Sequence, residues 1–111
     1  MGDAQEQLIE QGFELACRVD EVPVIMPKRV EVHGRGVLIC KADEGFFAVD
    51  EYCPHKYKSM AMGIVFDGQI NCPWHGYVFD LETGRCKSGK RCAPVTTYEV
   101  QVVDAYIWVR A

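Results

Sequence analysis

The chain has 111 residues, 49% of them hydrophobic and 25% charged, which predicts one globular domain with a modest core. A formal net charge of −4 and a pI near 5.3 argue against a general affinity for nucleic acid. No stretch approaches the roughly 20 apolar residues that cross a bilayer. The N-terminus also lacks a basic region followed by an apolar one, so we expect a cytoplasmic protein with no membrane partner.

The first twelve residues are polar, with Leu8 and Ile9 as their only large apolar side chains apart from the initiating Met1. This composition predicts a flexible N-terminal arm over residues 1–12, or at most one short helical turn. We expect the folded domain to begin at Phe13 and to extend to the end of the chain, over residues 13–111.

From Phe13 onward the chain is divided into short segments of alternating or β-branched and aromatic side chains, which predict strands. These segments are residues 13–17, 29–33, 37–41, 46–50, 64–66, 69–71, 95–103 and 106–110. Pro23 and Pro27 interrupt the stretch after the first strand, which predicts a loop or an edge strand there. No amphipathic segment of helical period and useful length is present, so the sequence predicts an all-β sandwich or barrel-like fold.

Two short segments carry the chemistry: Cys53-Pro54-His55 and, after sixteen intervening residues, Cys72-Pro73-Trp74-His75. The predicted hairpin over residues 64–71 would return the chain and bring the second segment beside the first. Each segment offers one thiolate and one imidazole. This donor set fits a [2Fe–2S] cluster in which one iron takes both cysteines and the other takes both histidines.

Two other interpretations of these residues remain open. Cysteine is often simply a small buried hydrophobic residue, and an isolated histidine is usually structural. Two Cys and two His also suit a structural zinc ion, in a metal-stabilised binding module without redox activity. Zinc sites usually pair Cys with Cys and His with His along the chain, whereas here each segment is mixed.

On Cys53, His55, Cys72 and His75, and on the Gly76 that follows, the chain resembles the Rieske iron–sulfur proteins, in particular their small soluble ferredoxins. The resemblance covers roughly residues 13–110. It implies a Rieske-like antiparallel β-sandwich with an inserted cluster-binding subdomain at about residues 52–94. It also implies that the two histidines lie at the surface, where electrons would leave.

The resemblance further implies a one-electron carrier rather than an enzyme, passing electrons from a flavin-containing reductase to a terminal oxygenase or similar acceptor. A free carrier of this kind is expected to be a monomer. The alternative within the family is the small Rieske-like subunit of a reductase such as nitrite reductase, bound permanently to its large subunit.

The neighbours of the four ligands predict a low reduction potential. High-potential relatives carry a disulfide between the loops and two hydroxyl side chains that donate hydrogen bonds to cluster sulfur. This chain has Lys58 and Trp74 at the disulfide positions, and Tyr77 and Phe79 at the hydroxyl positions. Fewer hydrogen bonds to sulfur stabilise the reduced form less, so we expect the lower part of the Rieske range of about −150 to +300 mV.

Four further cysteines lie outside the motif. Cys17 and Cys40 fall in apolar strand segments and are expected in the core, whereas Cys86 and Cys92 flank a basic loop. The strand-rich pattern favours reduced thiols, with a disulfide between the last two left open. Pro94 resembles the proline of a third loop that covers the cluster.

Basic side chains gather around the two motif segments, and they form either an ordinary solvated surface or a docking face for an acidic partner. They are Lys56, Lys58, Arg85, Lys87, Lys90 and Arg91.

Overall fold

The computed structural model describes residues 3–54, 57–74, 76–88 and 92–111. Within these ranges it contains one α-helix, one short 3₁₀ helix at Val19–Glu21 and nine strands. The elements are α1 (Asp3–Glu10), β1 (Glu14–Arg18), β2 (Lys28–Val32), β3 (Arg35–Ala42), β4 (Gly45–Asp50), β5 (Ile64–Phe66), β6 (Gln69–Asn71), β7 (Val78–Asp80), β8 (Thr97–Val103) and β9 (Tyr106–Arg110).

The N-terminal segment is more ordered than the arm that its composition predicts. Helix α1 runs for eight residues, more than the single turn we expected. Its Leu8 is buried and packs with Phe13 and Trp108. The backbone amide of Phe13 donates to the Leu8 carbonyl at 2.9 Å, which anchors the end of the helix to the start of β1. The expectation missed this because one buried leucine is enough to dock a short helix, and a single apolar residue gives no periodic signal.

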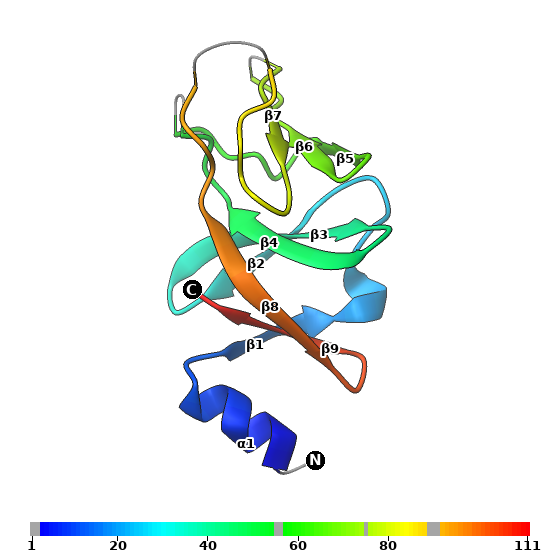
Figure 1. Cartoon of the computed structure of the whole chain (residues 1–111), viewed down its shortest axis with the longest axis vertical. Coiled ribbons are helices and arrows are strands. Elements are labelled where there is room, and N and C mark those ends of the chain that lie inside the picture. Colours follow the sequence, from blue (N-terminus) through cyan, green and yellow to red (C-terminus); the bar gives the residue numbers. More distant parts are fainter. Residues whose placement is uncertain (1–2, 55–56, 75, 89–91) are drawn as a thin grey trace.

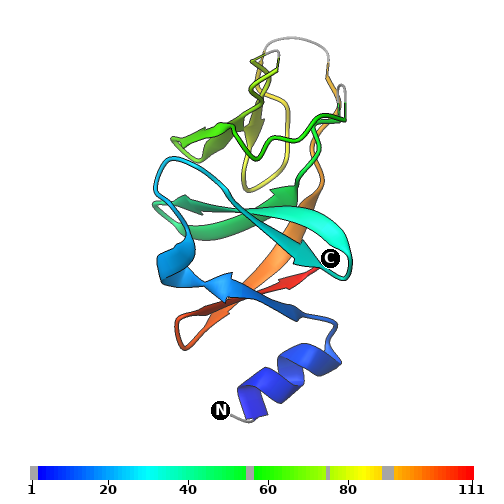
Figure 2. The same ribbon diagram turned by 180° about the vertical axis from the view of Figure 1, so that it is seen from behind.

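Six antiparallel strands form the main sheet, in the order β1-β9-β8-β4-β3-β2. The sheet curls so that β1 and β9 face β2, β3 and β4 as two layers, with β8 joining them (Figures 1 and 2). The layers enclose a core that includes Val32, Val37, Ile39, Ile107 and Val109. The predicted all-β antiparallel sandwich is therefore confirmed.

Strand β3 is apolar on both faces because it separates two cores. Val37 and Ile39 point into the core between the two layers of the main sheet. Leu38 and Cys40 belong instead to a second core, beneath the three-stranded sheet formed by β5, β6 and β7. Side chains alternate between the faces of a strand, so the uninterrupted run from Val37 to Cys40 supplies both cores at once.

The chain leaves the main sheet after β4 and returns to it at β8, where Thr97 and Tyr98 pair with Val49 and Ala48. Between these points β5, β6 and β7 form a separate three-stranded sheet. We call this excursion, residues 51–96, the small subdomain; it forms the end of the molecule opposite α1 (Figure 1). The predicted boundaries at about residues 52 and 94 remain a prediction.

The tight hairpin expected at residues 64–71 is confirmed. β5 pairs with β6 in the register Ile64↔Asn71, Val65↔Ile70 and Phe66↔Gln69. Its two-residue turn is Asp67 at φ 50° followed by Gly68 at φ 72°. Positive φ at both central residues is the geometry that Asp-Gly favours and that matches the twist of a hairpin.

Candidate iron–sulfur site

The two predicted cysteine ligands lie at the start of two loops with the same backbone hydrogen bonds. We call residues 53–58 loop 1 and residues 72–77 loop 2. In loop 1 the amide of Cys53 donates to the Lys58 carbonyl at 2.8 Å. In loop 2 the amide of Cys72 donates to the Tyr77 carbonyl at 2.7 Å. Each bond joins a cysteine to the residue five positions later.

A second hydrogen bond repeats between the loops and tightens each into one turn. The Cys53 carbonyl accepts from the amide of Tyr57 at 2.6 Å, and the Cys72 carbonyl accepts from the amide of Gly76 at 3.1 Å. Both donors have left-handed backbone conformations, with φ of 57° at Tyr57 and 71° at Gly76. Glycine adopts this region freely, whereas tyrosine does so at a cost. The two loops thus share one backbone conformation. Its left-handed position is filled by glycine in loop 2 (Gly76) but by tyrosine in loop 1 (Tyr57).

Both cysteines are buried where the loops meet the second core. Cys53 and Cys72 are each 1% exposed and belong to the cluster of buried side chains that includes Met60, Ile70 and Phe79. The backbone amide and carbonyl of each cysteine form hydrogen bonds within its loop. His55 and His75 lie outside the described residues, and within the described part of the chain no three His, Cys, Asp or Glu side chains form a metal-binding group.

The two cysteines predicted to be structural, Cys40 and Cys17, lie in strands of the main sheet. Cys40 is fully buried in β3, and desolvation raises the pKa of its thiol to about 12. Burial also raises the pKa of Cys17 in β1. A thiolate is the form that binds metal, so both residues are kept as thiols and serve as core side chains, as expected from their strand positions.

Loop 1 is held to the main sheet by Glu51, which sequence reasoning did not identify. The Glu51 side chain is buried, accepts from Arg29 Nε at 2.9 Å and accepts from the Ser59 hydroxyl at 2.7 Å. The Glu51 backbone forms hydrogen bonds to the main sheet and to the segment after loop 1. Its amide donates to the Gly36 carbonyl at 3.1 Å, and its carbonyl accepts from the Met60 amide at 2.8 Å. A Cβ at Gly36 would collide with the Glu51 carboxylate. The one sequence signal for this role is the position of Glu51, an acidic residue between the end of β4 and Cys53.

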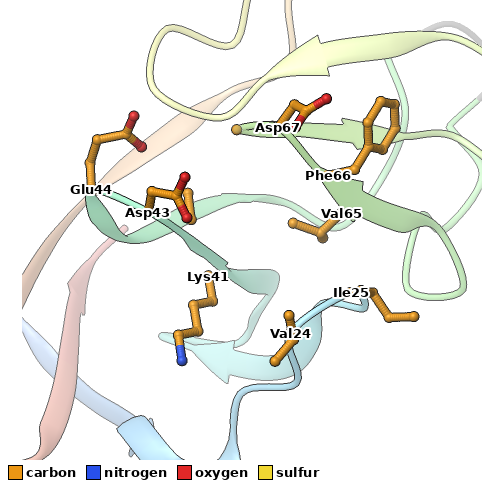
Figure 3. A pocket seen from close by; sticks show the side chains of 10 residues that line it. Val24, Ile25, Lys41, Asp43, Glu44, Val65, Phe66 and Asp67 are labelled. Carbon is orange, nitrogen blue, oxygen red and sulfur yellow. The ribbon is translucent and has the colours of Figure 1, made fainter.

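A groove of about 510 Å³ lies on the flank of the molecule, away from both loops. Val24 and Ile25 form one side, and Val65 and Phe66 of β5 form the other (Figure 3). None of the described residues of the two loops lines it. A cavity of this size is a usual feature of small-molecule sites, but it is separate from the buried cysteines and adds nothing to their chemistry.

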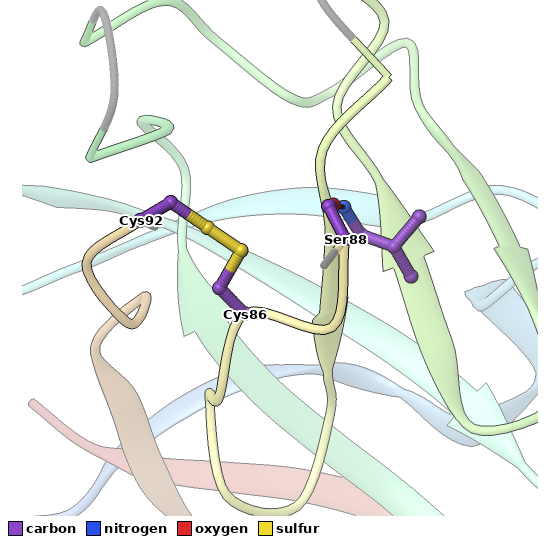
Figure 4. The surroundings of a disulfide bond; sticks show 4 residues. Cys86, Ser88 and Cys92 are labelled. Carbon is purple, nitrogen blue, oxygen red and sulfur yellow. Dashed lines mark hydrogen bonds between the residues drawn. A yellow bond between two sulfur atoms is a disulfide. The ribbon is translucent and has the colours of Figure 1, made fainter. Parts of the chain in front are cut away.

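Cys86 and Cys92 form a disulfide, so the expectation of reduced thiols was wrong for this pair (Figure 4). After β7 the chain turns back, Phe79 bridges to Cys86, and the amide of Val95 donates to Gly84 at 2.9 Å. These contacts place the two cysteine Cα atoms 6.0 Å apart, within the range of disulfides. The Ser88 hydroxyl accepts from the amide of Val78 at 2.6 Å and ties the same segment to β7. Sequence spacing alone could not reveal that the chain returns on itself here.

Comparison with known families shows the family to which this chain belongs. The Rieske [2Fe-2S] domain model matches residues 13–99, which includes both loops and most of the main sheet. The chain belongs to the Rieske [2Fe-2S] family. Membership implies one [2Fe–2S] cluster per chain and confirms the resemblance inferred from the two motifs.

Relatives of this Rieske domain include proteins of its own size and much larger ones. The ferredoxin subunit of biphenyl dioxygenase from Pseudomonas sp. (strain KKS102) is 34% identical over 91 residues, which cover 81% of this chain and 84% of the relative. Human apoptosis-inducing factor 3 is 27% identical over 95 residues, which cover 86% of this chain but only 16% of that protein. The chain therefore spans nearly all of a dioxygenase ferredoxin and a small part of the larger relative.

Solved structures agree with this assignment. The ferredoxin of carbazole 1,9a-dioxygenase from Nocardioides aromaticivorans IC177 superposes with a TM-score of 0.80 at 25% identity, over 87% of this chain and 95% of the ferredoxin. A nitrite reductase (NADPH) small-subunit structure reaches 0.77, over 89% of this chain and 98% of that one, but at 23% identity it shows the shared fold alone. Helix α1 is too short to cross a membrane, and the described part of the Rieske domain holds no helix that could.

Three of the residues that the resemblance places around the cluster, Lys58, Trp74 and Tyr77, lie in loops 1 and 2, whereas Phe79 lies in β7. Phe79 is fully buried below the loops, and Tyr77 is 8% exposed. Lys58 of loop 1 and Trp74 of loop 2 are in contact, with the Lys58 ammonium 4.6 Å from the centre of the Trp74 ring. Sequence reasoning placed both residues beside the ligands but did not predict that they touch.

Proposed function

We propose that the chain is a one-electron carrier whose [2Fe–2S] cluster is held by Cys53, His55, Cys72 and His75. The observation that carries this proposal is the repeated hydrogen-bonding pattern of loops 1 and 2, which buries one cysteine at the same point of each. Each loop also supplies one histidine, two residues after Cys53 and three residues after Cys72. Two matched loops therefore present two sulfur and two nitrogen donors, the set that a Rieske cluster requires.

The chain's own residues would contribute to electron transfer in three ways. The buried cysteines provide thiolates in a site that the second core shields from water. The loop hydrogen bonds fix both cysteine backbones, so little reorganisation accompanies a change of charge. Neutral imidazoles donate less negative charge than thiolates, which makes the histidine side of the site the easier one to reduce. When bound, the cluster supplies a centre that gains and loses one electron.

A low reduction potential belongs to the same proposal. Phe79 is fully buried and has no hydroxyl to donate to sulfur. The site therefore lacks one of the hydroxyl donors that the resemblance assigns to high-potential relatives, and the added electron is stabilised less.

The proposed partners are a flavin-containing reductase, as donor, and a terminal oxygenase, as acceptor. The dioxygenase ferredoxins among the relatives support this choice, as does a solved complex of reduced oxygenase and oxidized ferredoxin in carbazole 1,9a-dioxygenase, 25% identical over 90% of this chain. Lys58 of loop 1 is exposed, as are Arg85 and Lys87 on the segment after β7, and none of the three forms an ion pair with a described residue. They suit an acidic partner, and reduction by it should slow as ionic strength rises. We place the carrier in the cytoplasm as a monomer, which fractionation and size-exclusion chromatography test.

Metal analysis combined with a reductive titration tests the function. The purified protein should contain about two iron and two sulfide per chain and take up one electron per chain. Cys72→Ser should lose the iron, whereas Cys17→Ser, which changes a core thiol in β1, should keep it. A colourless protein that contains zinc and takes up no electron would favour the metal-stabilised binding module instead.

A further inference from the structure

Loops 1 and 2 are connected by a side-chain contact as well as by the cluster that they are proposed to share. The Lys58 ammonium lies over the ring of Trp74, 4.6 Å from its centre, within the range of a cation–π interaction. Each residue lies in the same loop as one of the two buried cysteines. The Lys58 carbonyl accepts the hydrogen bond from the Cys53 amide at 2.8 Å, and Trp74 follows Cys72 by two positions.

Among the described residues, the Trp74 ring is the contact that the structure shows for the Lys58 ammonium. Lys58 forms no ion pair with a described residue. With Ser59, Met62 and Pro73, the two side chains line a largely apolar groove of about 390 Å³. The lysine stem thus lies along apolar surface while its charge is held over the ring, and the half-exposed Trp74 is kept in place by the same contact.

We propose that Lys58 and Trp74 are positioning residues that act as a clasp between the two loops. The clasp fixes the separation of the loops, and with it the separation of the two ligand pairs. It also keeps one positive charge on the flank of the site, where it favours the state that carries the extra electron. This inference rests on the proposed ligand assignment, because it concerns how these two loops hold their shared cluster.

The clasp and the charge predict different responses in different variants. Cluster retention should depend on the contact, so Lys58→Met and Trp74→Leu should each release iron to a chelator about two- to fivefold faster, the range expected for an exposed cation–π pair. The double variant should be no faster than the worse single variant, because either change already removes the contact. Midpoint potential should depend on the charge: Lys58→Met should lower it, Lys58→Arg should preserve it, and Trp74→Leu should change it less than Lys58→Met does.

A matched control uses a cation–π pair elsewhere in the fold. The Arg18 guanidinium lies 5.6 Å from the centre of the Tyr106 ring, on β1 and β9 of the main sheet. Arg18→Met should leave both iron release and potential unchanged. If Trp74→Leu does not fold, Trp74→Phe retains a weaker ring and should release iron at an intermediate rate.

Strictly additive effects of Lys58→Met and Trp74→Leu on iron release would overturn the clasp, and so would a potential that Lys58→Met leaves unchanged. Failure of the proposed function appears separately, in the wild-type protein, as bound zinc without iron. In that event the same pair of variants, measured by zinc release, would still show whether the contact couples the loops.

Discussion

The main sheet and the small subdomain differ in how they are stabilised. The main sheet has strands of five to eight residues that enclose a continuous aliphatic core. The small subdomain has three strands of three residues each, and its order depends on loop hydrogen bonds, left-handed residues and a disulfide. So small a unit buries too little apolar surface to be stable alone. The region that carries the chemistry is therefore stabilised in two ways, by the second core that it shares with β3 and β4 and by local constraints in its loops.

This difference suits the proposed function. A site that exchanges electrons must lie close to the surface, where a large core cannot surround it. Short loops closed by backbone hydrogen bonds can hold ligands rigidly there without a thick apolar layer. The main sheet can then tolerate changes that the site cannot.

The largest effect is expected from the core beneath the loops. Phe79→Ala removes a fully buried ring and should cost about 3–5 kcal/mol. Because Phe79 packs in the second core, the visible absorbance of the cluster should be lost at a lower guanidinium concentration than the far-UV circular dichroism of the sheet. Ile39→Ala, in the main core, should instead lower both transitions together. Coincident transitions in Phe79→Ala would mean that the two regions unfold as one unit.

The disulfide should contribute next. Cys86 and Cys92 close a short loop, six residues apart, which corresponds to about 2 kcal/mol in the chain-entropy model. Cys86→Ser, or reduction of the wild type with a phosphine, should lower the midpoint of cluster loss and leave the main sheet intact. The pair can be counted by thiol labelling under native and reducing conditions. Equal cluster stability with and without reductant would show that the Cys86–Cys92 disulfide does not stabilise the bound cluster.

Glu51 joins the two regions, so its removal should affect both. Glu51→Gln weakens the bonds to Arg29 and Ser59 in a buried site and should cost about 1–2 kcal/mol. Glu31→Gln is the matched control, because Glu31 contacts the same Arg29 at 3.5 Å but is exposed. Glu31→Gln should therefore lower the free energy of unfolding much less than Glu51→Gln does. Both values follow from chemical denaturation of the intact protein, and similar losses in the two variants would argue against a bracing role for Glu51.

The smallest effect should appear at the equivalent left-handed positions of the two loops. Tyr57→Gly relieves an unfavourable backbone conformation at an exposed residue and should stabilise loop 1 by about 1 kcal/mol. Gly76→Ala imposes the same conformation on a side chain and should destabilise loop 2 by a similar amount. The rate of iron release to a chelator measures both. A slower release in Gly76→Ala than in wild type would contradict the equivalence of the loops.

Most of the main sheet could be predicted from the sequence, because alternation along residues 13–17, 37–41 and 106–110 reports directly on burial. The two motifs likewise predicted the family, whereas the assignment of Cys53, His55, Cys72 and His75 as ligands stays a prediction. The helix and the disulfide could not be predicted, because each depends on how the folded chain brings side chains together, and neither spacing nor composition contains that information. The Lys58–Trp74 contact was not predicted either, although the resemblance places these two residues where high-potential relatives join the loops by a disulfide. Glu51 escaped notice because an acidic residue at a strand end is ordinarily solvated.

The central claim is that sulfur and nitrogen ligands are divided between two irons of one cluster. Electron paramagnetic resonance of the dithionite-reduced protein, with electron–nuclear double resonance of the ligand nitrogens, tests it most directly. The account predicts one unpaired spin per chain, coupled strongly to two histidine nitrogens because the electron resides on the histidine side. Histidine-selective ¹⁵N labelling should change that coupling. A reduced cluster without strongly coupled nitrogen, or a protein with no reducible iron, would contradict the account.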